Sequence, residues 1–119
     1  MQSAIDVKAL QRAVGNDPDI ISEIVEDFVT YARSLISLVR TAVTQQDAEE
    51  LGITIHRLKG SANLVGAYGL LDTLSQVEAA ADATDWPTAR QLVPELHALM
   101  KHIEEAAVAI VDSRSTIWR

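Results

Sequence analysis

A histidine near the middle of the chain, His56, has neighbours suited to nucleophilic chemistry. Lys59 follows three residues later and Gly60 four residues later. Residues at these spacings share one face of an α-helix, so an ammonium group and bare backbone would flank the imidazole. A neutral imidazole nitrogen can attack a phosphoryl group, and the ammonium would offset the charge of the group it acquires. The spacing therefore predicts an accessible imidazole nucleophile with a positive charge beside whatever group it carries.

Two glycines lie one helical turn on either side of this histidine, Gly52 before it and Gly60 after it. Glycine inside a helix costs about 0.5–1 kcal/mol relative to alanine, so helix stability does not explain them. Close approach of another molecule to the His56 face would explain why both positions are glycine. The alternative is that Gly60 lets two helices pack closely, although it projects with His56 rather than with Leu58 and Ala62.

Glu78 is the candidate partner for the imidazole ring. It follows the inward-facing Val77 in the next helix, which we expect to run antiparallel to the helix of His56. A carboxylate that accepts the N–H of one ring nitrogen would fix the tautomer and orient the ring. The alternative is a glutamate that is simply solvated.

Helical periodicity extends over nearly the whole chain and predicts the elements that position these residues. The expected helices cover 6–14, 18–43, 48–65, 68–83 and a fifth segment that ends near Val111. We expect Pro94 to kink or break the fifth helix and residues 113–119 to form a frayed tail. Short connectors favour antiparallel neighbours, so the predicted fold of the single domain 1–119 is all-α. It is an up-down antiparallel four-helix bundle with a short extra N-terminal helix.

Composition excludes several classes of function. The formal net charge of −7 disfavours binding to nucleic acid or to anionic membranes, and no apolar run approaches the roughly 20 residues of a membrane-spanning helix. The absence of cysteine fits a cytoplasmic protein. His97 and His102 are five residues apart, on different helix faces, and do not form the i, i+4 pair of a zinc helix. We therefore expect no metal site.

The run His56-Arg57-Leu58-Lys59-Gly60-Ser61, with Gly66 ten residues after the histidine, resembles the motif of the histidine phosphotransfer (HPt) family. The expected helix lengths agree with that family's bundle over nearly the whole chain. The resemblance implies that His56 accepts a phosphoryl group from a receiver-domain aspartate and passes it to another receiver in a two-component phosphorelay. It also implies that Lys59 stabilises the phosphoryl oxygens. Glu78 stands where family members place a polar residue that bonds the phosphorylated histidine.

The resemblance also implies partners and a docking surface. The partners would be response-regulator receiver domains, one of them in a hybrid sensor kinase, and each would supply the acidic pocket that holds Mg²⁺. The chain itself would need no cofactor and would act as a monomeric phosphocarrier. It lacks a glycine-rich nucleotide-binding loop, so we expect it to have no ATP-dependent kinase activity of its own. It would work in the cytoplasm, alone or as a domain of a membrane-anchored sensor kinase. The residues expected to meet a partner are Gly52, Ile53, Arg57, Gly60 and Asn63.

Three alternatives share parts of this pattern. A phosphoacceptor (P1-type) domain of a chemotaxis-like histidine kinase would have the same bundle and motif but receive its phosphoryl group from an ATP-binding kinase domain. A non-catalytic helical adaptor would bind partners with His56 unmodified. A sensor-kinase dimerisation helix fits less well, since such helices carry an acidic residue after the histidine and a nearby proline. Here Arg57 follows, and the next proline is Pro87.

Overall fold

The computed structural model describes residues 4–117, and for 114–117 it describes the backbone alone. This part of the chain contains five helices and no strand. They are α1 (Val7–Val14), α2 (Pro18–Gln45), α3 (Ala48–Leu64), α4 (Tyr68–Asp82) and α5 (Trp86–Ile117).

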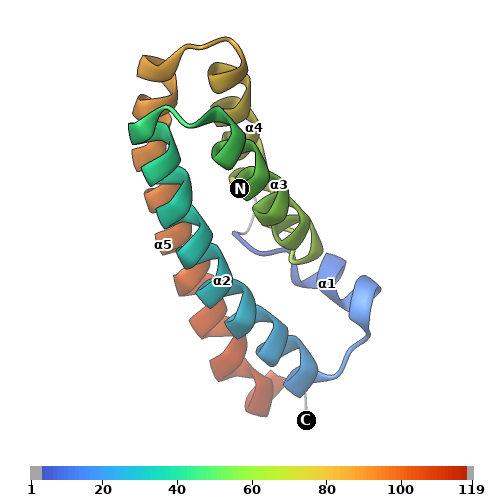
Figure 1. Cartoon of the computed structure of the whole chain (residues 1–119). Coiled ribbons are helices and arrows are strands. Elements are labelled where there is room, and N and C mark those ends of the chain that lie inside the picture. The colour runs from blue at the N-terminus through green and yellow to red at the C-terminus, as the bar shows by residue number, and fades with distance from the viewer. Residues whose placement is uncertain (1–3, 118–119) are drawn as a thin grey trace.

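Helices α2 to α5 run up and down as an antiparallel bundle, and α1 lies against one end of it (Figure 1). Each long helix packs on two others: α2 on α3 and α5, and α4 on the same pair. Helices α3 and α5 are therefore diagonal neighbours. Helix α1 touches α2 and α3. The predicted all-α bundle with a short N-terminal helix is confirmed.

Aspartate side chains begin four of the five helices. Asp6, Asp17, Asp47 and Asp85 each accept a hydrogen bond from a backbone N–H of the following turn. Such caps satisfy donors that the helix itself leaves unpaired. At Asp85 the hydroxyl and the backbone N–H of Thr88 both donate to the carboxylate, which lowers the pKa of Asp85. The cap that matters for the site is Asp47, because it starts α3 at Ala48.

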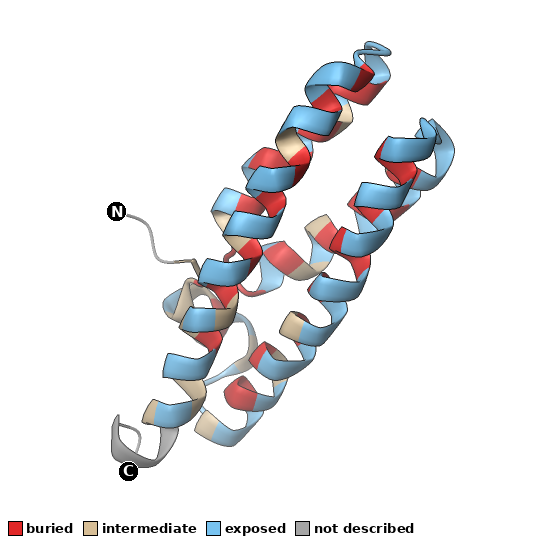
Figure 2. Cartoon of the chain, turned by 90° about the vertical axis from the view of Figure 1, so that its left-hand side faces the viewer, coloured by how far each residue is buried: buried red, intermediate tan, exposed pale blue. Residues whose placement is uncertain are grey.

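The core is an aliphatic stripe on the inward face of each helix (Figure 2). In α3 every residue expected in this stripe is buried: Leu51, Ile55, Leu58, Ala62 and, just past the helix, Val65. In α2 the three- and four-residue spacing of apolar residues in the sequence also predicts Ile20 in the buried stripe, and this prediction is wrong, because Ile20 is 46 % exposed. Ile21 and Val25, four residues apart, take the inward positions instead, as the helical period requires.

Helix α5 differs from its sequence prediction in two ways. It continues unbroken through Pro94, and it ends at Ile117 instead of near Val111. Pro94 and Arg90, whose carbonyl the proline leaves without its helical partner, are both exposed, so water can bond that carbonyl. No glycine or proline follows Val111 to stop the helix. The tail expected over 113–119 is therefore helical to Ile117, and 118–119 lie outside the described residues.

Candidate functional site

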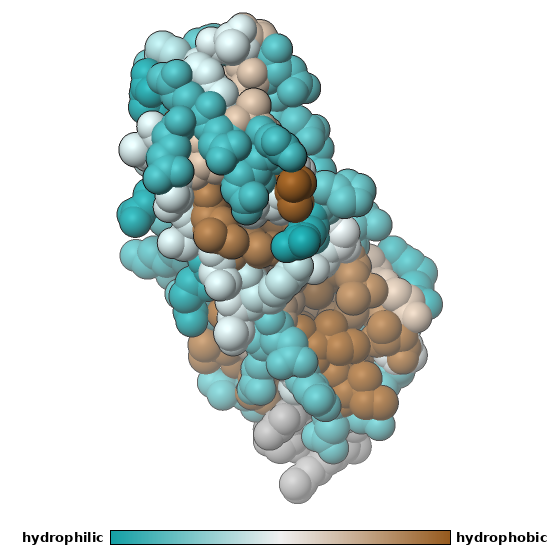
Figure 3. Space-filling model, in the orientation of Figure 1, coloured by the Kyte–Doolittle hydropathy of each residue, from teal (hydrophilic) through white to brown (hydrophobic). Residues whose placement is uncertain are grey.

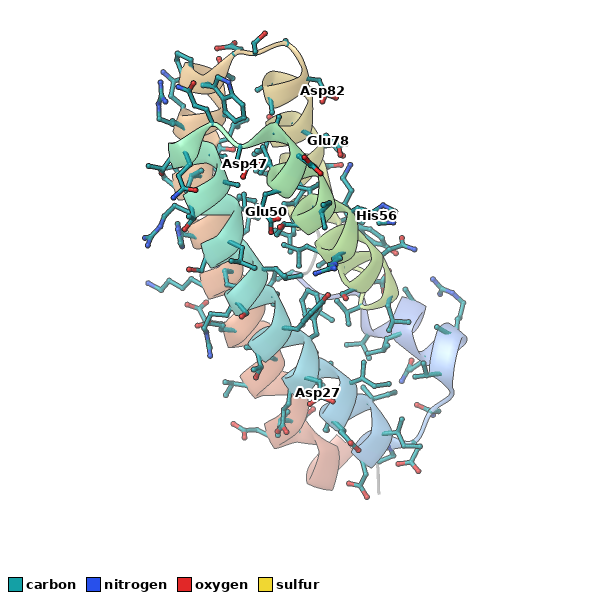
Figure 4. The ribbon with its side chains drawn as sticks, viewed as in Figure 1. Asp27, Asp47, Glu50, His56, Glu78 and Asp82 are labelled. Atoms are coloured by element: carbon teal, nitrogen blue, oxygen red, sulfur yellow. The ribbon has the colours of Figure 1, made fainter. Side chains whose placement is uncertain are left out.

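His56 lies in the middle of α3 on the side that faces away from the core (Figure 4). Its side chain is exposed, whereas Ile55 and Leu58 beside it are fully buried. Among the described residues it has no hydrogen-bond or ion-pair partner. The packing of α3 thus leaves the imidazole outside the bundle with its ring nitrogens available.

The cation beside it, Lys59, is held by a carboxylate of the neighbouring helix. Lys59 Nζ lies 3.0 Å from Oε1 of Glu78 on α4. The two side chains are 28 % and 39 % exposed, so water reaches the pair and the bond can exchange. Because Lys59 is one turn along from His56 on the same helix, its long side chain can reach the His56 face when it leaves Glu78.

The hydrogen bond expected between Glu78 and the His56 ring is not among the contacts of the residues that the structure describes. The partner of the Glu78 carboxylate on α3 is instead Lys59. The structure describes the unphosphorylated chain, so the role of Glu78 towards a phosphorylated ring stays a prediction.

Gly52 and Gly60 face open space. A Cβ atom built on either residue would meet no atom of the chain within 4 Å. Close packing of helices within this molecule is therefore not the reason for these glycines. The free volume lies on both sides of His56, one turn away in each direction, where another molecule can approach the imidazole.

Gly66 has a different purpose. Its φ is +68°, a conformation that side chains disfavour, and a Cβ there would overlap the Cβ of Asp6 and crowd its backbone, whose Cα and N would lie 3.1 Å away. The N–H of Asp6 donates to the carbonyl of Val65 at 3.0 Å. Gly66 thus makes the turn after α3 and lets the start of α1 close against it.

The expected docking residues share the outer face of α3. Ile53 is 44 % exposed, and Arg57 and Asn63 are exposed as well. Leu64, which the sequence analysis did not select, is 41 % exposed on the same helix. An isoleucine and a leucine open to solvent beside a reactive group are typical of a contact surface.

Helix α2 extends this surface with two residues that sequence reasoning also missed. Tyr31 and Leu38 are 42 % and 46 % exposed and seven residues apart, so they share one face of α2. Leu38 lies eight residues before Gln46 and His56 nine after Asp47, which places them at about the same height in antiparallel helices. The sequence did contain a signal for these two residues: both are apolar or aromatic, and both lie outside the stripe of α2 that forms the core.

A hollow between α2 and the end of α3 continues from this surface. Its lining is largely apolar and consists of Ile24, Asp27, Phe28, Tyr31, Ser61, Leu64 and Val65. Figure 3 shows brown, apolar surface in this lower part of the molecule, next to α1. We call Tyr31, Leu38, Ile53 and Leu64 together the apolar rim of the site.

The other two histidines lie on α5, away from this face, and both are exposed. Nδ1 of His102 is 3.8 Å from a carboxylate oxygen of Glu105, and His97 faces a groove between α2 and α5. Over residues 4–117, no three His, Cys, Asp or Glu side chains gather in a way that could hold a metal ion.

These features define a class: an antiparallel helical bundle with an exposed imidazole on the outer face of α3 and a lysine one turn along the same helix. Comparison with protein families agrees. The Hpt domain model matches residues 23–106, well over half of the chain, so the chain belongs to the Hpt domain family, whose members carry out histidine phosphotransfer in phosphorelays. No curated protein and no solved structure matches it significantly.

Filling the open space beside His56 is expected to raise the stability of the chain and to slow phosphoryl transfer. Gly60→Ala adds a methyl group that meets nothing in the chain, so it is expected to stabilise α3 by about 0.5–1 kcal/mol. The same methyl group obstructs a partner, so phosphoryl transfer is expected to slow. Urea unfolding and a transfer time course measure the two effects. Faster transfer, or a loss of stability, would contradict this reading of Gly60.

Proposed function

We propose that His56 accepts a phosphoryl group from the aspartyl phosphate of one receiver domain and returns it to the aspartate of another. The observation that carries this proposal is an exposed imidazole, without a partner among the described residues, between two glycines that border open space. Membership of the Hpt family supports it.

The transfer is a displacement at phosphorus. The lone pair of one His56 ring nitrogen forms the N–P bond while the bond between phosphorus and the bridging carboxyl oxygen of the aspartyl phosphate breaks, and the aspartate leaves as a carboxylate. The second ring nitrogen keeps its proton, and Glu78 is our candidate to accept that N–H. We take the nitrogen remote from the main chain as the attacking one. In our proposal Mg²⁺ is bound by the acidic pocket of the receiver.

Lys59 stabilises the phosphoryl oxygens in this scheme. Its ammonium group is within reach of the His56 face and can exchange from Glu78 to the more highly charged phosphoryl group, because the pair is open to water. Lys59→Ala is expected to lower the rate of phosphorylation by about tenfold, which corresponds to one charge-assisted hydrogen bond of roughly 1.5 kcal/mol. Rapid-quench transfer assays measure this rate.

Arg57→Ala is the matched control for that prediction. It also removes one cation beside His56, but Arg57 is exposed and has no hydrogen bond or ion pair among the residues described. Its effect is expected to be smaller and confined to receiver binding. If the two variants slowed transfer equally, Lys59 would contribute only general positive charge.

The apolar rim is our proposed docking surface for the receiver, with Gly52, Arg57, Gly60 and Asn63 at its centre. Ile53→Asp places a charge in that contact and is expected to weaken receiver binding about tenfold, as the loss of an interface anchor does. Titration calorimetry with a receiver measures it. Val108→Asp on α5 is the control, since Val108 is 60 % exposed away from α3 and its change is expected to leave binding unaltered.

The chemotaxis-type alternative predicts a different phosphoryl donor. The deciding experiment incubates the chain with radiolabelled phosphorylated receiver domains and, separately, with ATP and an ATP-binding kinase domain of the chemotaxis type. Acid-labile label that comes from receivers alone supports the relay. Label that comes only from the kinase supports the P1-type domain, and no label from either donor supports the adaptor.

We place this exchange in the cytoplasm, either in the chain alone as a monomer or in a domain of a sensor kinase. Within residues 4–117, none of the helices has the length and apolar character needed to cross a lipid bilayer.

A further inference from the structure

A second surface of the bundle gathers positive charge in a chain that is otherwise acidic. The groove between α2 and α5 has Arg33, Arg40, His97 and Lys101 along its rim and Ile36 and Met100 at its floor. We call these six residues the α2–α5 groove. Three of the ten Lys and Arg residues of the chain line it against one carboxylate, Glu104, although the net charge of the whole chain is −7.

The positive charge is only partly neutralised within the molecule. Arg33 is bound to Glu104, with Nε and a terminal nitrogen each 3.0 Å from the same carboxylate oxygen. Arg40 and Lys101 have no hydrogen bond or ion pair with any residue in the described part of the chain. Two free cations, together with His97, therefore remain for a ligand.

The helical spacing brings these groups onto one line. Arg33 and Arg40 are seven residues apart on α2, and His97 and Lys101 are four apart on α5. Both spacings repeat one helix face, so the two helices present their cations towards the same seam. Arg33 and Arg40 lie about 10 Å apart along the axis, the length of about three extended residues.

The shape of the groove selects the kind of ligand. Ile36 and Met100 are 2 % and 5 % exposed, so the floor is closed and nothing can insert deeply between the helices. A ligand must lie along the groove and meet its rim. A long polyanion such as RNA would also run over the acidic remainder of the surface, which repels it. A short segment with a few carboxylates fits the rim without that penalty.

We propose that the α2–α5 groove binds a short acidic peptide segment of a partner protein, at the same time as a receiver occupies the His56 face. The two surfaces are compatible because α3, which carries His56, and α5 are diagonal in the bundle. Both surfaces use α2, but Arg33 and Arg40 each lie two residues after Tyr31 and Leu38, which is about 200° around the helix and so on its opposite face. The groove would thereby tether the partner that delivers or accepts the phosphoryl group, and it does not depend on His56 chemistry.

The test uses the full chain and a fluorescein-labelled twelve-residue peptide of Asp, Glu and Leu, with fluorescence anisotropy as the readout. We expect saturable binding at low salt that weakens as salt rises. Arg40→Glu with Lys101→Glu is expected to weaken binding at least about tenfold, by repulsion of the peptide carboxylates. Lys8→Glu with Arg12→Glu changes the net charge equally on exposed positions of α1 and is expected to leave binding nearly unchanged.

Three results would overturn the proposal. They are the absence of saturable binding at low salt, equal losses in both double variants, and tighter binding of a single-stranded oligonucleotide of the same charge. A parallel phosphorylation assay on the groove variant separates this proposal from that for His56. We expect an isolated receiver domain without an acidic tail to phosphorylate the groove variant as well as the natural chain.

Discussion

His56→Gln is expected to abolish phosphorylation of the chain by every donor and to leave its fold intact. The amide of glutamine has about the size and polarity of the imidazole but no nitrogen lone pair that can attack phosphorus. His56 is exposed and has no hydrogen bond or ion pair in the described structure, so the free energy of unfolding is expected to change by less than about 0.5 kcal/mol. Label transfer and urea unfolding measure the two quantities.

The chain provides its own controls for that experiment. His97→Gln and His102→Gln replace exposed histidines of α5, and both variants are expected to accept label at the rate of the natural chain. If His56→Gln kept its label, or if either α5 variant lost it, the acceptor would be another residue.

Gly66→Ala is expected to cause the largest loss of stability of any single methyl addition at the chain's glycines near the site. The backbone at Gly66 has a φ of +68°, and the added Cβ would overlap Asp6, where main-chain atoms cannot move aside easily. The strain of the conformation and the displacement of Asp6 together predict a loss of about 2–4 kcal/mol. Urea unfolding followed by circular dichroism measures it.

The comparison with Gly60→Ala sharpens this prediction, because the same chemical change is expected to have opposite signs at the two positions. The fold requires a glycine at position 66, whereas glycine at position 60 is expected to leave room for a partner to reach His56. Equal destabilisation by both variants would mean that Gly60 also serves packing. A stable Gly66→Ala variant would mean that the turn can adapt and that Asp6 is not held where the structure places it.

Much of the fold could be predicted from the sequence, because its signals are local. The aliphatic stripe of α3 has a strict helical period, and Asp17-Pro18 and Asp47 are strong helix starts, so these elements lie where they were expected. The prediction for Ile20 was wrong because Ile20 and Ile21 are adjacent in the first turn of α2, and only Ile21 lies on the inward face. Helix α5 continues through Pro94 because the proline lies on an exposed face, which the sequence alone does not reveal.

The part of the site that lies within one helix could be predicted from the sequence, but the contacts between helices could not. His56, Lys59 and the two flanking glycines belong to one helix, so their shared face follows from spacing alone. The partner of Lys59 depends on the height of α4 beside α3, which sequence spacing does not determine. Tyr31 and Leu38 join the His56 face only through the pairing of α2 with α3, and the contact of Gly66 with Asp6 joins residues sixty positions apart.

The most direct test of the phosphoacceptor is to find the bond that it forms. The chain is charged by a phosphorylated receiver, digested at neutral pH and mapped by mass spectrometry that preserves N–P bonds. We predict one acid-labile phosphoryl group, on the peptide that contains His56. A phosphoryl group on a different peptide, or one that survives acid treatment, would contradict the account.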